Sequence, residues 1–194
     1  SFQTTVLGSA CPKDGTVLTQ IPGKTLMRDG SDAIGFKQLC VDSVAAAPTP
    51  EAAKAIIYIF KNLGGIYDAP RRSQSRFDCS GYMSKAYEYA GVLMHATGGD
   101  GQKNYFTTHR LMPHSWGTRP DWIVQVDPLV MQPGDLMFPF DGHVVMVLAH
   151  GYMAHSPGSG DVNHVRKVYS TFKQVNRVVP ELSPKPFEPL QVLS

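Results

Sequence analysis

Apolar residues recur at helical spacing in two stretches of the chain, residues 52–63 and 79–89. The first stretch follows Thr49-Pro50, where Thr is a preferred N-cap and Pro suits the first helical position. Gly64-Gly65 comes after this stretch and Gly91 after the second, and glycine commonly ends a helix because it adopts the left-handed conformation without strain. The pattern predicts two amphipathic helices.

Short apolar runs rich in β-branched residues follow further along the chain. Turn residues separate them, first at Gln132-Pro133-Gly134-Asp135 and again at Asp141-Gly142. The runs cover residues 136–138, 143–150, 152–156 and 164–169. Their spacing predicts an antiparallel meander, and the fold class we expect is α+β, with N-terminal helices packed on this sheet.

Three segments lack clear periodicity. Residues 1–47 have short strand-like runs between Gly, Pro and Asp, so we expect an irregular N-terminal appendage with little helix. Residues 95–128 contain both Trp and are too long for a structureless connection unless they shape a cleft or lid, so we expect them to face a substrate. Residues 180–194 contain four Pro and are expected to form an extended tail. The main domain would then span residues 48–179.

Composition fits a globular domain of 194 residues, with 42% hydrophobic and 18% charged residues. The net charge of +2 is too small for a nucleic-acid-binding surface, and no apolar run is long enough to span a bilayer. The chain begins at Ser1 without the basic and apolar segments of a secretion signal, so we expect any such signal either to have been removed or never to have been part of this sequence. No phosphate-binding or dinucleotide-binding glycine motif occurs, and we expect no cofactor.

A candidate nucleophile lies at the start of the second predicted helix, within Phe77-Asp78-Cys79-Ser80-Gly81. A thiol at this position is close to unpaired backbone N–H groups, which favour the thiolate, the reactive form. His143 follows Gly142 and leads a Val-rich strand, and His155 lies on the next strand. One imidazole can accept the thiol proton, while a polar group on its far nitrogen fixes its tautomer. The combination indicates a cysteine hydrolase.

Each of these residues also has an ordinary structural interpretation. A Cys in an amphipathic helix is usually a small buried hydrophobe, although the polar sequence around Cys79 disfavours burial. His143 taken alone is a hydrogen-bonded sheet residue by default. Tyr67, in the segment before Cys79, is a further candidate, although a Tyr by itself more often packs than takes part in catalysis. Asp78 has an adequate role as a helix N-cap, with or without a second function.

The chain has three cysteines. If Cys79 stays reduced as a nucleophile, Cys11 and Cys40 remain as an even pair, and we expect a disulfide between them; two buried free thiols are the alternative. In the chain-entropy model a loop of that size contributes about 3 to 4 kcal/mol, and such bonds persist in oxidising compartments.

The histidines other than His143 and His155 do not suggest a metal site. His109 and His114 are five residues apart (114 − 109 = 5), which fits no common zinc spacing, and neither Cys11 nor Cys40 has a neighbouring ligand pair. We expect loop or surface positions for His95, His109, His114, His150 and His164. Two of these, His109 and His114, could line the cleft with Trp116 and Trp122, or a Trp could instead fill the core.

Taken together, these residues resemble the NlpC-type family of bacterial cell-wall cysteine peptidases. The resemblance covers residues 51–169 and includes the Cys79 pentapeptide, the turn Pro133-Gly134-Asp135-Leu136, the strand after Gly142-His143, and His155. It implies a papain-like fold and hydrolysis of peptidoglycan stem peptides, commonly between D-glutamate and the diamino acid. The family has a Tyr near its oxyanion site, at the position of Tyr67, and usually a Gly-Gly pair shortly after it. This chain has no such pair there, because the sequence continues Asp68-Ala69-Pro70-Arg71-Arg72, and it carries a longer insertion before its strands.

The resemblance also implies roles for individual residues. Cys79 would be the nucleophile, His143 the general base, His155 its orienting partner and Tyr67 a neighbour of the oxyanion site. Asp78 and Ser80 would bind the charged ends of a short peptide, and we place Gly142 and Trp116 with them in the substrate site.

Three classes of function follow. The first is a secreted, periplasmic or cell-wall-associated endopeptidase that acts as a monomer on peptidoglycan or muropeptides. The second is a related thiol enzyme, either an amidase that separates sugar from peptide or an acyl or amide transferase. The third is a non-catalytic cell-wall-binding protein, against which the intact set of Cys79, His143 and His155 argues.

Overall fold

The computed structural model describes residues 7–13, 21, 23–27, 35–68, 76–112 and 119–185. The α-helices are α1 (Phe36–Ala46), α2 (Pro50–Lys61), α3 (Cys79–Tyr89) and α4 (Thr108–Leu111). The strands are β1 (Ile66–Tyr67), β2 (Arg76–Phe77), β3 (His95–Thr97), β4 (Lys103–Tyr105), β5 (Ile123–Val126), β6 (Leu136–Phe138), β7 (Val145–Val147), β8 (Tyr152–His155), β9 (His164–Lys167) and β10 (Gln174–Val178). Short 3-10 helices are η2 (Gly8–Ala10), η4 (Pro128–Val130), η5 (Ala149–Gly151) and η6 (Pro180–Leu182).

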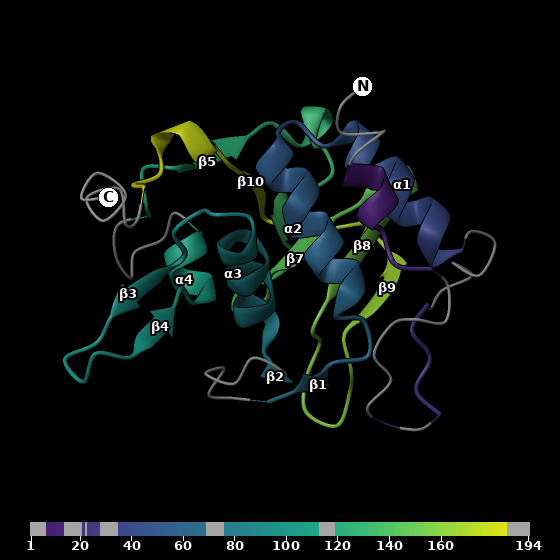
Figure 1. Ribbon diagram of the computed structural model, residues 1–194, viewed down its shortest axis with the longest axis horizontal. Helices are drawn as coiled ribbons and strands as arrows, with labels where there is room; N and C mark the ends of the chain where they lie inside the picture. The colour runs from purple at the N-terminus through teal and green to yellow at the C-terminus, as the bar shows by residue number, and fades with distance from the viewer. Residues whose placement is uncertain are drawn as a thin grey trace, which may run out of the picture.

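Helices α2 and α3 confirm the two helices predicted from the sequence. The Thr49 side chain accepts a hydrogen bond from the Ala52 N–H at 3.0 Å and so caps α2. Asp78 caps α3 in the same way, through the Gly81 N–H at 2.7 Å. The two helices pack on each other and cover one face of the sheet (Figure 1).

The main sheet has six strands in the order β5-β10-β6-β7-β8-β9, and all neighbours in it are antiparallel. Strands β6 to β9 are consecutive neighbours and confirm the predicted meander, although β7 is shorter than the apolar run around it. Strands β5 and β10 were not predicted. Their polar residues at Gln125, Gln174 and Asn176 weaken the apolar pattern, and the pairing of β10 with both β5 and β6 supplies the order instead.

Alternating residues of the strands point to opposite faces of the sheet. Leu136 and Phe138 of β6 join the core cluster beneath the helices, whereas Met137 packs with Val145 and Val147 on the other face. No helix in the described part of the chain is both long enough and apolar enough to cross a membrane.

Gly134 allows the predicted turn before β6 to approach the helices closely. Its φ is +98°, and a Cβ at this position would lie 2.9 Å from the Ala52 Cβ. The Tyr87 hydroxyl donates to the Gly134 carbonyl at 2.5 Å. Next along the chain, buried Asp135 forms a two-point ion pair with Arg177 of β10, with both N···O distances 2.8 Å. These contacts fix the start of the meander against α2 and α3.

Helix α1 corrects the prediction of an irregular segment before Ala47. Leu39, Cys40 and Val44 are fully buried and share one core cluster with α2. The sequence has no clear apolar stripe here, so packing and the covalent link specify the helix more than periodicity does. Cys40 forms the expected disulfide with Cys11, with 5.9 Å between the Cα atoms. The division of the chain near Ala47 stays a prediction, and α1 and α2 lie on its two sides.

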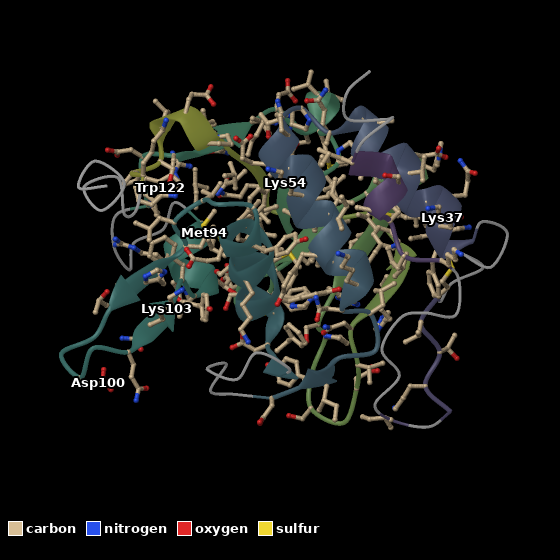
Figure 2. The ribbon with its side chains drawn as sticks, in the orientation of Figure 1. Lys37, Lys54, Met94, Asp100, Lys103 and Trp122 are labelled. Atoms are coloured by element: carbon tan, nitrogen blue, oxygen red, sulfur yellow. A yellow bond between two sulfur atoms is a disulfide. The ribbon has the colours of Figure 1, made fainter. Side chains whose placement is uncertain are left out.

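The segment 95–128 carries regular structure of its own. It includes the hairpin β3-β4, which projects from the molecule, together with α4 and β5 (Figure 1). Trp122 is half-buried, donates from Nε1 to the Leu93 carbonyl at 2.9 Å and packs near Phe106, which supports the core-filling alternative for this residue (Figure 2). Trp116 and His114 lie outside the described residues.

Candidate active site

Cys79 is the first residue of α3, and only the N-cap Asp78 separates it from β2. Strand β2 pairs in parallel with β1, so that Tyr67 lies opposite Phe77. Gly65 permits this arrangement, because a Cβ on it would come within 2.5 Å of the Phe77 ring. The short β1-β2 pair therefore holds Tyr67 and the approach to Cys79 side by side.

The Cys79 sulfur lies against the backbone on both sides of His143. Its distance to the Gly142 carbonyl oxygen is 3.5 Å, and the Val144 N–H also hydrogen-bonds to it. On another side, the Thr108 hydroxyl of α4 lies 3.6 Å from the sulfur. Thr108 was not among the residues predicted for the site, although segment 95–128, which contains it, was expected to face the substrate.

His143 follows the turn at Gly142, which has a φ of +82°. The imidazole stacks on the Phe140 ring, with 5.2 Å between the ring centres and 17° between the planes. Its Nε2 lies 2.9 Å from Nδ1 of His155, on the neighbouring strand β8. The sequence prediction had these two histidines on adjacent strands. The structure corrects this for His143, which lies two residues before β7, and joins it to His155 of β8 by a hydrogen bond.

Burial governs the charges of the two central groups. Burial raises the pKa of the Cys79 thiol above its ordinary value, although the Thr108 hydroxyl and the Val144 and Ser80 N–H groups act in the opposite direction. Burial, with repulsion from Arg166, lowers the pKa of His143 to about 4. The helix-terminus effect expected from the sequence thus lowers the pKa of Cys79 through the Ser80 N–H, but burial raises this pKa by more. The resting pair at neutral pH is therefore a neutral thiol and a neutral imidazole.

His164 corrects the expectation of a loop or surface position. It begins β9, is only 3% exposed, and its Nε2 lies 3.0 Å from Nε2 of His155. The sequence could not show this contact, because it depends on the register that places His164 directly opposite His155.

Two further predicted site residues, Asp78 and Ser80, flank Cys79 in the sequence. Asp78 is buried and also accepts a hydrogen bond from the buried Ser80 hydroxyl at 3.4 Å, so both side chains support the helix start from below the surface. Their contact with substrate, and the oxyanion role of Tyr67, stay predictions.

The remaining described histidines are His95, His109 and His150, and each either pairs with a carboxylate or is exposed to solvent. His95 pairs with Glu88 and the exposed His150 pairs with Asp42, each at 2.8 Å, and His109 of α4 is exposed. Among the residues that the structure describes, no group of three or more His, Cys, Asp or Glu is arranged to hold a metal ion.

Helices packed on an antiparallel sheet, with a cysteine that opens a helix and a histidine just before one strand that bonds to a histidine on the next, are the arrangement of the papain-like cysteine peptidase superfamily. The sequence matches the NlpC/P60 family over residues 64–179, more than half of the chain. The chain therefore belongs to the NlpC/P60 family and has a peptidoglycan hydrolase-like domain, and the family typically consists of cysteine peptidases that act on peptidoglycan.

Solved structures of this family are similar to the chain. An NlpC/P60 family protein from Bacillus cereus has a TM-score of 0.50 and 24% identity, with 69% of this chain and 42% of that protein covered. NlpC1 from Trichomonas vaginalis has a TM-score of 0.48 and 23% identity, with 69% and 45% covered. A P60 domain of an antigen from M. avium subspecies paratuberculosis has a TM-score of 0.47 and 22% identity, with 66% and 95% covered. The chain thus spans less than half of the first two proteins, and no curated protein matches its sequence.

Proposed function

We propose that this chain is a cysteine endopeptidase that hydrolyses peptidoglycan stem peptides between D-glutamate and the diamino acid. The observation that carries the proposal is the placement of the Cys79 sulfur against Gly142 and Val144, on both sides of a His143 that is hydrogen-bonded to His155. The disulfide and the family's cell-wall substrate are consistent with an extracytoplasmic location, and we propose that the protein is secreted.

The mechanism begins from the neutral pair. As the Cys79 sulfur attacks the peptide carbonyl, its proton passes to Nδ1 of His143, which is the ring nitrogen not bonded to His155. A carbon–sulfur bond forms and the carbonyl oxygen becomes an oxyanion. The backbone N–H of Cys79 and the Tyr67 hydroxyl are the donors that we assign to this oxyanion, each contributing about 3 to 4 kcal/mol when well placed.

Collapse of this intermediate breaks the carbon–nitrogen bond. His143 gives its proton to the leaving amine, and the acyl group stays on Cys79 as a thioester. Water then attacks the thioester while His143 again accepts a proton, which releases a carboxylic acid product and restores the thiol. Asp78 supports this cycle by capping the helix that carries Cys79, and Gly142 shapes the turn beside it.

A digest of purified muropeptides, followed by mass spectrometry, tests the proposal. We expect two peptide fragments from the intact chain and none from Cys79→Ala, whereas the exposed control Lys54→Ala should cleave normally. Release of the free lactyl-sugar would instead identify an amidase, and an acyl adduct on an added amine would identify a transferase. Binding of muropeptides with no cleavage by the intact chain would contradict any catalytic function.

A further inference from the structure

Three buried histidines form a continuous hydrogen-bonded line that begins at the candidate base. His143 Nε2 lies 2.9 Å from His155 Nδ1, and His155 Nε2 lies 3.0 Å from His164 Nε2. The line ends on the backbone, where His164 Nδ1 lies 3.0 Å from the Val162 carbonyl oxygen. None of the three imidazoles is more than 5% exposed. The proposed mechanism uses the first two rings and leaves the third without a role.

The backbone fixes the far end of this line. His164 lies directly opposite His155 in the β8-β9 register. The neighbouring Asn163 exchanges two hydrogen bonds with the chain before β1, from its N–H to the Gly65 carbonyl at 2.8 Å and from the Gly64 N–H to its carbonyl at 2.9 Å. Val162 also forms a bridge with Ile66. The Val162 carbonyl is therefore held in place by backbone contacts on both sides of it.

The direction of every hydrogen bond in the line follows from its last acceptor. A carbonyl oxygen can only accept, so Nδ1 of His164 must carry the proton, and in a neutral imidazole Nε2 is then an acceptor. His155 must consequently donate from Nε2 and accept at Nδ1. His143 must then donate from Nε2, which leaves the lone pair on its Nδ1.

We infer that His164, held by the Val162 carbonyl, is a positioning residue that fixes the tautomer of His143 through His155 and so keeps Nδ1 of His143 available as the base. The role of that nitrogen as a base rests on the proposed function, whereas the tautomers themselves follow from the hydrogen-bond line. Without an acceptor at its Nε2, His155 could carry its proton on Nδ1 instead. His143 would then have to accept at Nε2 and hold its own proton on Nδ1, where it could not receive the thiol proton.

Heteronuclear NMR of the isotope-labelled protein reads these tautomers directly, because protonated and unprotonated ring nitrogens have different chemical shifts. We expect the proton on Nδ1 in His164 and on Nε2 in both His155 and His143. A His143 protonated on Nδ1, or a His155 protonated on Nδ1, in the folded wild-type protein would overturn the inference.

Two substitutions separate tautomer control from simple packing. His164→Gln keeps a side-chain oxygen that can accept from His155, whereas the side chain in His164→Leu cannot accept a hydrogen bond. We expect the Gln variant to keep the His143 tautomer and most of kcat, and the Leu variant to show mixed tautomers and a kcat at least about tenfold lower with KM little changed. His150→Gln, an exposed histidine outside the line, should behave as the wild type. Equal losses of kcat in the Gln and Leu variants, with an unchanged His143 tautomer, would contradict the positioning role.

The outcomes also distinguish this inference from the proposed function. If the Leu variant does not fold, the wild-type spectrum and the Gln variant still decide between the tautomers. A chain that shows the expected tautomers but cleaves no muropeptide would support the hydrogen-bond line and defeat the proposed reaction. A chain that cleaves muropeptides with His143 protonated on Nδ1 would support the proposed reaction and defeat the inference about the tautomers.

Discussion

At the residue scale, the burial of His143 sets the acid limit of the proposed reaction. The base must be neutral to accept the thiol proton, and its pKa is lowered to about 4, so the active form is retained as the pH falls until about that value. We expect the acidic limb of the kcat/KM profile to have its midpoint near pH 4, which steady-state assays on muropeptides would measure. A midpoint near the ordinary histidine value of about 6.5 would contradict this assignment.

Arg166 provides the matched variant for this pH profile. Its positive charge is the second cause of the lowered pKa of His143, after burial. Arg166→Gln removes the charge and should move the acidic midpoint upward, because protonated His143 is then repelled less. The shift should be smaller than the effect of burial, and a downward movement would count against the geometry of the site.

Thr108 offers a second prediction at this scale. Its hydroxyl, 3.6 Å from the sulfur, can donate to the thiolate and so opposes the rise in the pKa of Cys79 that burial causes. Thr108→Val should slow alkylation of Cys79 by iodoacetamide at neutral pH by about tenfold, because hydrogen bonds to charged groups contribute about 1.5 to 3 kcal/mol. Thr108→Ser should preserve the rate. The other two cysteines form a disulfide, so alkylation reports on Cys79 alone.

The residues of the site differ in how far sequence could reveal them. Cys79, His143 and His155 stand next to strong local signals, namely a helix start, a glycine turn and a strand. Thr108 and His164 have no such signal. Each reaches the site through a tertiary contact, Thr108 through the return of α4 onto α3 and His164 through the cross-strand pairing with His155.

At the scale of single elements, the two capped helices form a matched pair for a stability test. Thr49→Ala and Asp78→Ala each remove the backbone hydrogen bond that caps a helix, so each should lower the free energy of unfolding by at least about 1 kcal/mol in denaturant titrations. Asp78→Ala also removes the acceptor of the Ser80 hydroxyl. Only Asp78→Ala should also reduce kcat/KM, because α3 carries Cys79 and α2 does not. Equal activity of the two variants would show that the cap has no effect on the nucleophile.

The elements that sequence predicted are those with both a boundary signal and a regular apolar pattern. Helices α2 and α3 have caps, apolar faces and terminal glycines, and the meander β6 to β9 has turns between its apolar runs. Helix α1 has neither a side-chain cap nor a clear stripe, and it depends on burial against α2. Strand β10 joins the sheet by returning between β5 and β6, an order that local patterns cannot specify.

At the scale of the whole molecule, the segment before Ala47 lies outside the family match over residues 64–179 but still contributes contacts to the fold. Ser43 of α1 accepts a hydrogen bond from the Ala149 N–H at 2.9 Å, just after β7, so α1 contacts the meander as well as α2. The Lys37 ammonium donates to the Cys11 carbonyl at 3.2 Å, beside the disulfide (Figure 2). The segment thus supports the same helix layer that carries the candidate nucleophile.

This arrangement leads to a prediction about the disulfide. Cys11 and Cys40 are both buried, and the bond closes a loop with a sequence separation of 29. Replacing both with Ala should lower the free energy of unfolding by about 3.5 kcal/mol, because the unfolded chain regains the entropy of the open loop. Chemical denaturation measures this loss, and Cys79→Ala, which leaves the disulfide intact, is the control and should change stability by no more than about 1 kcal/mol.

Activity distinguishes a stabilising disulfide from one that shapes the site. Cys79 lies on α3, while the disulfide joins α1 to the chain after η2, so the double Ala variant should keep its kcat at temperatures where it remains folded. Its loss of activity on heating should coincide with its lower unfolding midpoint. Loss of activity in the folded variant would show instead that the disulfide shapes the site at the start of α3. An unchanged unfolding midpoint would show that the disulfide does not stabilise the fold.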